Sequence, residues 1–389
     1  MSMSRQPQPI SAITTLVTKG TTPTTLGRPF TDEGVTFVKA EALNGDSGLE
    51  VTGFSHIDED THELLARSRL EEGDVLVTIA GAHVGRCGYV KADHLPANTN
   101  QAVGIVRMDK SIALPRYIYY FFKQPSTFAL CQSLGGQAAQ PNVNLTVLKS
   151  IEVPLPTLGT QQAIADILSA YDDLIENNRR RMALLEEAVR QLYREWFVCL
   201  RFPGHEHTGI INGVPEGWES KCLGEWVQIK KGKNITKETV EEGTVPVVAG
   251  GLEPAYFHSA ANAKGPVVTV SASGANAGYV NIYLQDVWAS DCSYISVEWT
   301  SDVYYFYCLL KYMQQELFAL QNGAAQPHVY PKDVQRLSTV SPPKRLLQYF
   351  AGTVEPHFEL IANLTTQNHH LRAARNLLLP RLMRGEVAV

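Results

Sequence analysis

The sequence lacks the features that would tie it to a membrane or to the cell exterior. No stretch approaches the roughly 18 consecutive apolar residues that a membrane-spanning helix needs. The first residues, MSMSRQPQPISAITT, contain no apolar run long enough for a signal peptide, so we expect a cytoplasmic protein. The six cysteines are scattered, without a CxxC pair or metal-ligand spacing. We therefore expect free and mostly buried thiols.

The motifs of several enzyme classes are missing as well. There is no GxxxxGK[ST] nucleotide loop, no GxSxG elbow, no HExxH zinc site and no Asn/Asp-Pro-Pro-Tyr/Phe of adenine methyltransferases. His205 and His207 in HEH could bind a metal, but they lie in a Pro/Gly-rich segment without further ligands nearby. A solvated surface pair explains them better. We expect no catalytic, cofactor-binding or metal-binding residue in this chain.

Positive charge is also scarce, since 34 Lys and Arg residues face 39 Asp and Glu residues, giving a net charge of −5. This balance argues against coating nucleic acid with the whole surface, but it allows a localised basic face. With 389 residues, of which 44% are hydrophobic, the chain is long enough for two or three domains that each bury a core.

What the sequence does contain is an internal repeat. The heptapeptide QAAQPNV (137–143) returns as GAAQPHV (323–329), 186 residues later. The chain therefore consists of two copies of one unit, each a variable half followed by a helical segment. The same offset aligns Pro156 with Pro342, Ile175 with Ile361, Leu185 with Leu371 and Leu192 with Leu378.

The helical segment of each copy has the heptad pattern of a coiled coil. Seam residues recur in alternating steps of four and three, and Thr160 is the expected N-cap of the first helix. In the first copy the seam is Ile164, Leu168, Tyr171, Ile175, Asn178, Met182, Leu185, Val189, Leu192 and Trp196. In the second copy it is Phe350, Val354, His357, Ile361, Leu364, Asn368, Leu371, Arg375, Leu378 and Leu382.

The two helices are expected to pair with each other. Asn178 and Asn368 lie in mid-seam, where buried Asn fixes register, while Gly352 and Pro356 predict irregular first turns in the second helix. Two repeats most simply pair the helices antiparallel about a pseudo-two-fold axis. The alternative is that each helix packs only on its own globular domain.

The variable halves predict α+β domains. Short β-branched runs bounded by turns, such as 73–81, 102–108 and 265–274, indicate strands. An aromatic and helical stretch follows in each half, and we expect both stretches to be core rather than platforms for stacking bases. The predicted boundaries are a first domain at 1–156, a central long helix at 157–203, a second domain at 204–342 and a distal long helix at 343–389.

The loops of both halves are rich in side chains that suit DNA. Gln and Asn can form bidentate hydrogen bonds with adenine, and Arg or Lys with guanine, while Lys, Thr and backbone N–H groups suit phosphates. Each residue could instead brace its own loop or lie on a solvated surface. The candidate DNA-binding residues are Lys19, Thr21, Thr22, His83, Arg86, Gln137, Gln140, Asn142 and Asn144 in the first copy, and Lys231, Lys233, Asn234, Ser273, Asn276, Gln326, His328 and Tyr330 in the second.

Two stretches carry a resemblance to a known family. PLPTLGTQQAIADILSAYDDLIENNRRRMALLEEAVRQLYREWFV (154–198) is similar to the central region of the specificity subunits of type I restriction-modification systems. VPEGWESKCLGEW (214–226) is similar to the start of one of their target recognition domains. The resemblance covers essentially the whole chain. The first domain departs from it by lacking Gly-Trp-Glu, and the distal helix begins PKRLLQYF without the Gln-Gln pair.

The resemblance implies two tandem α/β target recognition domains separated by two long antiparallel coiled-coil helices. It implies a non-catalytic subunit that reads a bipartite, asymmetric sequence in double-stranded DNA, with the helices setting the unread spacer. The subunit would dock two modification (methyltransferase) subunits, which bind S-adenosylmethionine and methylate adenine at N6. Restriction subunits, which use ATP and Mg, would add cleavage in defence against foreign DNA.

Two other classes of function remain open at this point. The chain could be the recognition region of a fused restriction-methylation enzyme, or a hydrolase with an unrecognised site. Methyl transfer by the purified chain alone would support an enzyme. It could also be a coiled-coil scaffold without a DNA role, although the Gly/Gln loop retained in both halves argues against this reading.

Overall fold

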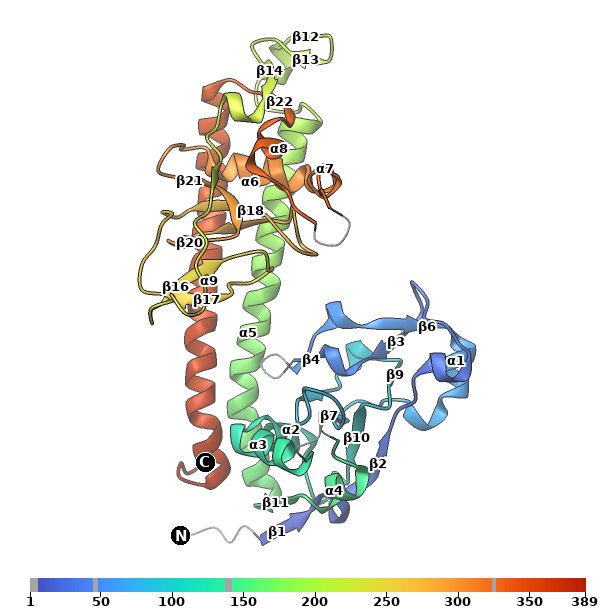
Figure 1. Ribbon diagram of the computed structural model, residues 1–389. Helices are drawn as coiled ribbons and strands as arrows, with labels where there is room; N and C mark the ends of the chain where they lie inside the picture. The colour runs from blue at the N-terminus through green and yellow to red at the C-terminus, as the bar shows by residue number, and fades with distance from the viewer. Residues whose placement is uncertain (1–5, 45–47, 137–141, 324–326) are drawn as a thin grey trace. The chain divides into compact units, whose positions relative to one another are not determined.

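The computed structural model describes residues 6–44, 48–136, 142–323 and 327–389. The chain divides into two compact units, which are described separately below (Figure 1). Unit 1 comprises Met1–Glu176 and Asn368–Val389, and unit 2 comprises 177–367. None of the helices in the described ranges has the length and apolar composition needed to cross a bilayer.

Unit 1 is built around a four-stranded antiparallel sheet. Its strand order is β2 (Thr14–Lys19), β10 (Val103–Met108), β7 (Val75–Thr78) and β8 (Cys87–Tyr89). A three-stranded sheet orders β6 (Ser55–Ile57), β3 (Val35–Val38) and β9 (Ala97–Thr99), with β3 and β9 parallel. The smaller pairs are β1 (Gln6–Pro9) with β11 (Glu152–Leu155) and β4 (Leu43–Asn44) with β5 (Gly48–Leu49).

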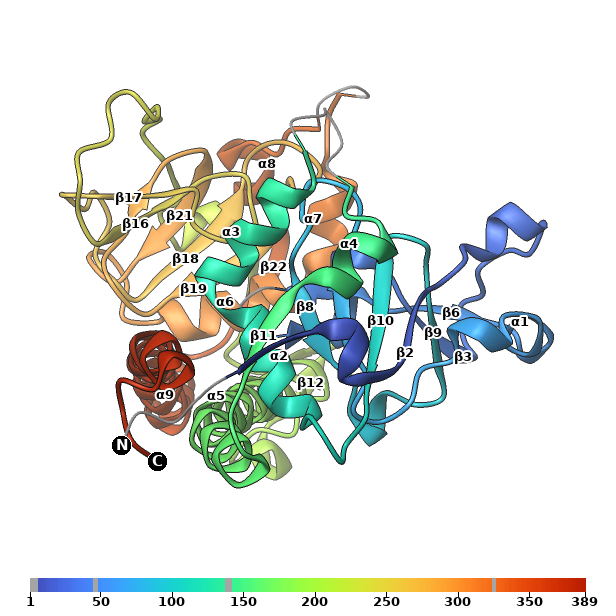
Figure 2. The ribbon, with the colours of Figure 1, turned by 90° about the horizontal axis from the view of Figure 1, so that it is seen from below.

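Helix α2 (Pro115–Lys123) packs on one face of the larger sheet of unit 1. The other helices of this unit are α1 (Glu59–Leu64), α3 (Pro125–Leu134), α4 (Leu145–Ser150) and the first part of α5 (Leu158–Tyr193). Successive side chains of a strand point to opposite faces, so Val75 and Val77 pack with α2, whereas Leu76 packs with Val38 of the smaller sheet. Figure 2 views the long helices end-on, with α2 between α5 and the larger sheet.

Unit 2 repeats the order of the four-stranded and three-stranded sheets of unit 1. Its larger sheet orders β15 (Lys230–Lys231), β21 (Cys292–Ser296), β18 (Val267–Ser271) and β19 (Val280–Tyr283). Its three-stranded sheet orders β17 (Tyr256–His258), β16 (Val245–Val248) and β20 (Trp288–Ala289), again with one parallel pair. The short pairs are β14 (Glu219–Cys222) with β22 (Ser338–Ser341) and β12 (Ile210–Ile211) with β13 (Val214–Pro215).

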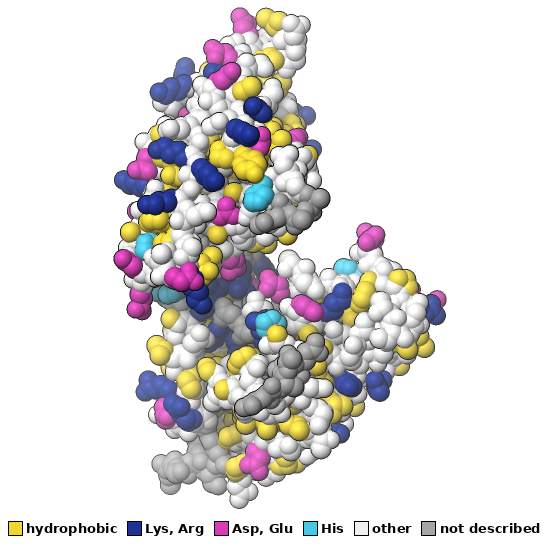
Figure 3. Space-filling model, viewed as in Figure 1, with side chains coloured by type: hydrophobic (Ala, Val, Ile, Leu, Met, Phe, Trp, Pro, Cys, Tyr) yellow, Lys and Arg dark blue, Asp and Glu magenta, His cyan; other side chains and the backbone are white. Residues whose placement is uncertain are grey.

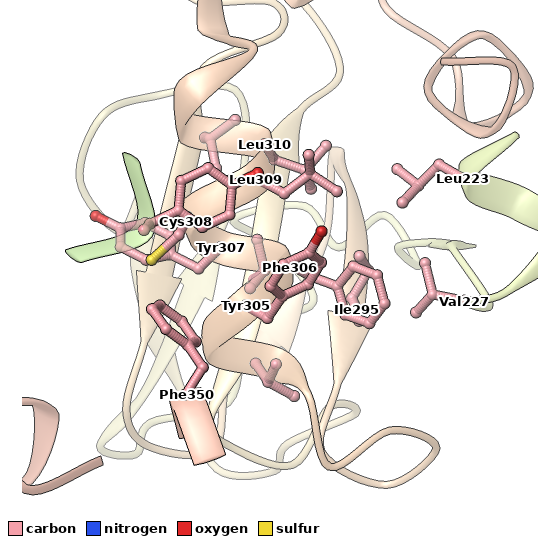
Figure 4. Close-up of a cluster of buried hydrophobic side chains, with 14 of the residues drawn as sticks. Leu223, Val227, Ile295, Tyr305, Phe306, Tyr307, Cys308, Leu309, Leu310 and Phe350 are labelled. Atoms are coloured by element: carbon pink, nitrogen blue, oxygen red, sulfur yellow. The ribbon is translucent and has the colours of Figure 1, made fainter. Parts of the chain in front are cut away.

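The helices of unit 2 follow the same order. They are α6 (Val303–Tyr312), α7 (Gln314–Ala319), α8 (Pro331–Gln335) and the first part of α9 (Lys344–Arg384). Figure 4 shows Tyr305, Phe306 and Leu309 of α6 among Leu223, Val227, Ile295 and Phe350. In both units the aromatic stretch is buried, from Tyr117 to Phe122 and from Tyr305 to Leu310, which confirms that it is core.

The expected α+β fold with two tandem copies and two long helices is confirmed. The helices also pack antiparallel. In unit 1, Asp172 of α5 meets Arg375 of α9, and the side chain of Asn368 donates to Ile175 O. In unit 2, the side chain of Asn178 donates to Gln367. Each helix packs on a globular core too, since Ile164, Leu379 and Leu382 join the core of unit 1.

Two local expectations about the helices are wrong. Helix α5 begins at Leu158, and the hydroxyl of Thr157 accepts the N–H of Thr160 at 3.3 Å, so Thr157 takes the capping place expected for Thr160. Helix α9 is continuous through Gly352 and Pro356. A helical proline clashes with the carbonyl four residues earlier, and here that residue is a glycine, which leaves the backbone more room to adjust.

The two units are divided differently from the predicted domains. The sequence places one boundary before each long helix, near residues 157 and 343, whereas the compact units change within α5 after Glu176 and within α9 after Gln367. The compact units follow spatial contacts, whereas the predicted domains follow the sequence repeat. The two divisions differ because the first part of each long helix belongs to the core of one unit and its last part to the core of the other. The predicted domain limits, which describe the two copies of the repeat, stay a prediction.

Candidate nucleic-acid interface

In unit 1, the sheet register gathers the predicted segments at one end of the larger sheet. Strand β10 starts where β2 and β7 end, since Gly104 pairs with Lys19 and Val103 pairs with Thr78. The turn after β2 carries Thr21 and Thr22, and the turn after β7 carries His83 and Arg86. Segments that are more than 60 residues apart in sequence therefore meet because antiparallel strands alternate in direction.

The heptapeptide loop of unit 1 joins the same end. Asn142 forms an isolated bridge with Ala80, and the N–H of Val143 donates to Ile79 O at 2.8 Å. The loop is therefore tied to the residues that follow β7. Gln137 and Gln140, the loop's candidates for reading bases, lie outside the described residues.

Unit 2 brings together the equivalent segments. Lys231 pairs with Ser293, and Ser271 pairs with Cys292, so β15 and β18 end where β21 starts. Lys233 and Asn234 follow β15, and Ser273 and Asn276 follow β18. The second heptapeptide is tied in by the N–H of Val329, which donates to Ala272 O at 3.0 Å, and by a bridge between Ser273 and His328. Gln326 lies outside the described residues.

A glycine sets the path of the lysine-bearing turn in each unit. A Cβ on Gly20 would overlap the carbonyl group of Thr99, and a Cβ on Gly232 would overlap the carbonyl oxygen of Ser290. Thr99 ends β9 and Ser290 directly follows β20, so the two glycines occupy equivalent places. The chain can pass this closely only without a side chain. Lys19 and Lys231 immediately precede these glycines, and both are exposed.

Several candidate side chains also have structural partners. The backbone N–H of Thr22 donates to Gln101 Oε1 at 3.0 Å, and Arg67 donates to the hydroxyl of Thr21 at 3.2 Å. Asn144 caps α4, its Oδ1 accepting the N–H of Val147 at 2.9 Å. The hydroxyl of Ser273 donates to Asp291. For these residues bracing the loop is an observed role, whereas contact with DNA stays a prediction.

Other candidates are more open to solvent. Lys19, His83, Asn142, Lys233 and Asn234 are exposed. Arg86 and Asn276 are half-buried, and the ring of His328 lies parallel to that of Tyr330, which is 43% exposed. Exposed cationic, amide and aromatic groups at one sheet end form a surface that could hydrogen-bond to phosphates and stack on bases.

The structure adds residues that the sequence reasoning missed. Gln101 precedes β10 and contacts the Thr22 turn, and Arg67 contacts the same turn from the segment after α1. In unit 2, the indole N–H of Trp288 donates to Lys233 O at 2.8 Å. The ammonium of Lys233 lies 5.9 Å from the centre of the Trp288 ring. Only Gln101 had a recognisable sequence signature, as a glutamine in a turn directly before a predicted strand.

The charge on the surface is mixed. Figure 3 shows Lys and Arg side chains spread over the drawn face of unit 2, with acidic side chains between them. A surface of both signs fits the small negative net charge. A local cationic group at the sheet end matters more for binding phosphates than the net charge does.

The groups with strongly shifted pKa values are buried side chains. Burial raises the pKa of the Cys87 and Cys292 thiols to about 12, which keeps them protonated and unreactive. Burial also lowers the pKa of Lys311, whose ammonium donates to Val280 O at 2.9 Å. Among the described residues, no group of three His, Cys, Asp or Glu side chains could hold a metal ion. Nδ1 of His205 lies 2.8 Å from the carbonyl oxygen of Phe202, which can only accept a hydrogen bond.

Known proteins with a similar sequence share one description. The family model of the type I restriction modification DNA specificity domain matches residues 12–187 and 215–348. The MjaIX type I restriction enzyme specificity subunit of Methanocaldococcus jannaschii is 28% identical over 78% of this chain and 76% of that protein. The putative MjaX specificity subunit of the same organism is 24% identical over 92% and 88%.

A solved structure shares the fold. The type I restriction-modification S subunit from M. genitalium superposes with a TM-score of 0.60 at 17% sequence identity, covering 98% of this chain and 96% of that one. At this identity the likeness concerns the fold alone. It extends over both units and both long helices, because almost the whole chain is covered.

Proposed function

This chain belongs to the family of type I restriction modification DNA specificity domains, and from this premise we propose that it is the non-catalytic DNA-recognition subunit of a type I restriction-modification complex. The observation that carries the proposal is the repeated convergence of three candidate segments on one end of the larger sheet, in unit 1 and again in unit 2. One scaffold with different loop residues is what reading two different short sequences requires.

Each unit would read one part of a bipartite target in double-stranded DNA. The two sets of loops share their frame but differ in side chains: His83 and Arg86 in unit 1 stand where Ser273 and Asn276 stand in unit 2. Because different side chains favour different base edges, the two parts of the target should differ in sequence, and the target should be asymmetric.

The long helices would dock the partner subunits. On their outer faces they carry large exposed apolar side chains, including Leu174 (49% exposed), Leu184 (70%) and Leu377 (71%). Exposed apolar residues on a helix are consistent with a protein partner. We propose two methyltransferase subunits as these partners, with S-adenosylmethionine bound by them. Restriction subunits that use ATP and Mg would join the same complex.

The test is a genome-wide map of N6-methyladenine in the source cells, with and without this gene. We expect one split motif, two short specified parts around a fixed gap, to lose methylation on deletion. An unchanged map in cells in which the methyltransferase partner is expressed and copurifies with the chain would contradict the proposal. Restoring the gene on a plasmid should restore the same motif.

A further inference from the structure

The seam between α5 and α9 in unit 1 contains an ion pair between a buried arginine and a partly exposed aspartate. Nη1 of Arg375 on α9 donates to Oδ1 of Asp172 on α5 at 2.5 Å. Arg375 is 2% exposed and is among the largest fully buried side chains of the described residues. A buried guanidinium is tolerated only when a carboxylate or several acceptors compensate it.

Further groups complete this cluster. Nζ of Lys123 on α2 lies 3.3 Å from Oδ2 of Asp172, and the hydroxyl of Tyr120 donates to the same oxygen at 2.8 Å. Nε and Nη2 of Arg375 donate to Oδ1 of the neighbouring Asn376. The Asp172 carboxylate thus receives hydrogen bonds from α2 and α9, and it joins both to α5.

The equivalent positions in unit 2 are apolar. With the offset of 186 residues, Asp172 corresponds to Phe358 and Arg375 to Val189. Both are 1% exposed in the core of unit 2. The ring of Phe358 stacks on that of Tyr304, with centroids 4.4 Å apart and an interplanar angle of 9°. The two copies of the repeat therefore differ in polarity at this pair of seam positions.

Each mid-seam asparagine also corresponds to an apolar residue in the other copy of the repeat. Asn178 corresponds to Leu364, and Asn368 corresponds to Met182. Nδ2 of Asn178 donates to Gln367 Oε1 at 2.9 Å within unit 2, and Nδ2 of Asn368 donates to Ile175 O at 3.3 Å within unit 1. Both amides therefore find acceptors when α5 pairs with α9.

Three apolar seam positions are identical in the two helices. Ile175 matches Ile361, Leu185 matches Leu371, and Leu192 matches Leu378. Two copies of this chain could therefore pair α5 with α5 and α9 with α9 in the same antiparallel register without losing these apolar contacts. These identical positions cannot oppose such an exchange, so the discrimination must come from seam positions at which the two helices differ.

The buried polar groups would oppose it. In an α9–α9 pair, Arg375 would meet Phe358 of the second copy and lose the Asp172 carboxylate. In an α5–α5 pair, Asp172 would keep Lys123 but meet Val189 in place of Arg375. A buried ion that loses its partner costs much free energy, whereas exchanging one apolar neighbour for another costs little.

We propose that the Asp172–Arg375 pair, supported by Asn178 and Asn368, selects the pairing partner: it directs α5 to α9 of the same chain and rejects a second copy. The inference concerns folding of the chain and does not require DNA binding. If the function proposed above holds, the selection also keeps two different recognition units in one molecule.

The experiment exchanges the two residues that carry the asymmetry. In the full-length double variant V189R/R375V, α5 carries both members of the ion pair and α9 carries neither. Wild type and variant are each co-expressed as two differently tagged copies and purified through both tags in turn. Native mass spectrometry then identifies the mixed-tag dimers by their mass. We expect mixed-tag dimers to rise by about tenfold or more in the variant, because specificity is a difference between two pairing free energies.

A second variant covers the case in which the first does not fold. K123M/D172F/R375V makes unit 1 apolar at residues 172 and 375, as unit 2 already is at Phe358 and Val189, and removes the lysine that would lose its partner. We expect this variant to fold and to form more mixed-tag dimers than wild type. As a control, E187A/R190A removes an exposed ion pair of α5, in which Arg190 Nη2 lies 2.7 Å from Glu187 Oε2, and should leave dimer formation unchanged.

The proposal is overturned if either folded variant stays monomeric to the same extent as wild type. It is also overturned if wild type forms mixed-tag dimers as readily as the variants. Neither readout involves DNA or methylation. A negative result here would leave the proposed function standing, and an unchanged methylation map would leave this inference standing.

Discussion

Among single residues, the exposed lysines next to Gly20 and Gly232 provide the most direct test of the proposed interface. Lys19 lies at the proposed DNA-binding end of the unit 1 sheet, and Lys110 lies beyond the opposite end of β10. Both are exposed, so replacing either with alanine removes the same charge at comparable structural cost. In unit 2, Lys233 and Lys264 form the same kind of matched pair around β18 and β21.

We predict that Lys19→Ala and Lys233→Ala weaken DNA binding of the complex, and that Lys110→Ala and Lys264→Ala do not. Each lost phosphate contact should lower the slope of log affinity against log salt by about 0.9. The measurement is the affinity of the complex for DNA that contains the motif found by methylation mapping, at a series of salt concentrations. Equal losses from both members of a pair would mean that the sheet end is not the interface.

A buried histidine in unit 1 predicts a pH dependence. Burial lowers the pKa of His94 below its ordinary value of 6.5. Its ring meets Phe54 edge-on, and its Nδ1 accepts the N–H of Lys91 at 3.2 Å. The unfolded chain takes up a proton near pH 6.5 while the folded imidazole stays neutral. The free energy of unfolding therefore falls as the pH drops below 6.5, until the folded imidazole is protonated as well.

We predict that His94→Asn, which keeps an acceptor for Lys91, reduces this loss of stability. The measurement is the urea midpoint of wild type and variant at about pH 7.5 and about pH 5.5, with the difference set by the linkage between protonation and unfolding. A drop of the same size in both proteins would show that His94 does not titrate in this range.

At the scale of elements, the start of α5 depends on a cap. The hydroxyl of Thr157 accepts the N–H of Thr160, and loss of such a cap costs about 1 kcal/mol. We predict that Thr157→Ala lowers the free energy of unfolding by about this amount and that Thr157→Ser does not, since serine keeps the oxygen. Urea unfolding distinguishes the two. Equal loss in both variants would mean that the methyl group, and not the cap, matters.

The paired helices predict how the unread spacer is set. Met182 of α5 meets Thr365 of α9 in unit 2, so residues 182–188 and 359–365 form matched heptads in the antiparallel pair. Deleting both removes about 10 Å from each helix at 1.5 Å per residue. If the helices hold the recognition units apart, the gap in the methylated motif should shorten by about three base pairs, at about 3.4 Å each.

Methylation mapping of the double deletion provides the measurement. The two specified parts of the motif should remain, since the deletion leaves the loops at both sheet ends unchanged. Deletion of 182–188 alone should destabilise the protein instead, because it shifts every seam residue against its partner. An unaltered gap after the matched deletion would exclude the helices as the ruler.

For the whole molecule, the repeated topology predicts that the two parts of the target can be changed separately. Substituting His83 and Arg86 should alter the preferred bases in one part of the motif only. Substituting Asn276 and His328 should alter only the other part, because each pair belongs to a separate unit. Methylation maps of the two double variants make the comparison. A change in both parts from either variant would contradict separate reading.

The repeat is also the reason why so much of the fold could be predicted. Strands such as 75–78 and 267–271 lie within predicted runs, and the aromatic stretches are buried helices. These elements have a strong local pattern of apolar residues. Where a residue's role depends on a neighbour distant in sequence, the local pattern carries no information. Gln161 is an example: its side chain bonds Leu114 N–H and Ile112 O, and the equivalent Leu347 is buried in the second core.

The sequence by itself determined the tandem repeat, the two long helices, the α+β class and the family, because periodicity and repetition are properties of the chain. Only the tertiary structure decided that three separate loops meet at one end of each sheet, and that Asp172 and Arg375 form an ion pair. Those facts depend on strand register and helix pairing, which place residues together that are up to 203 positions apart. Such long-range contacts follow from packing the whole chain, and no local stretch of sequence encodes them.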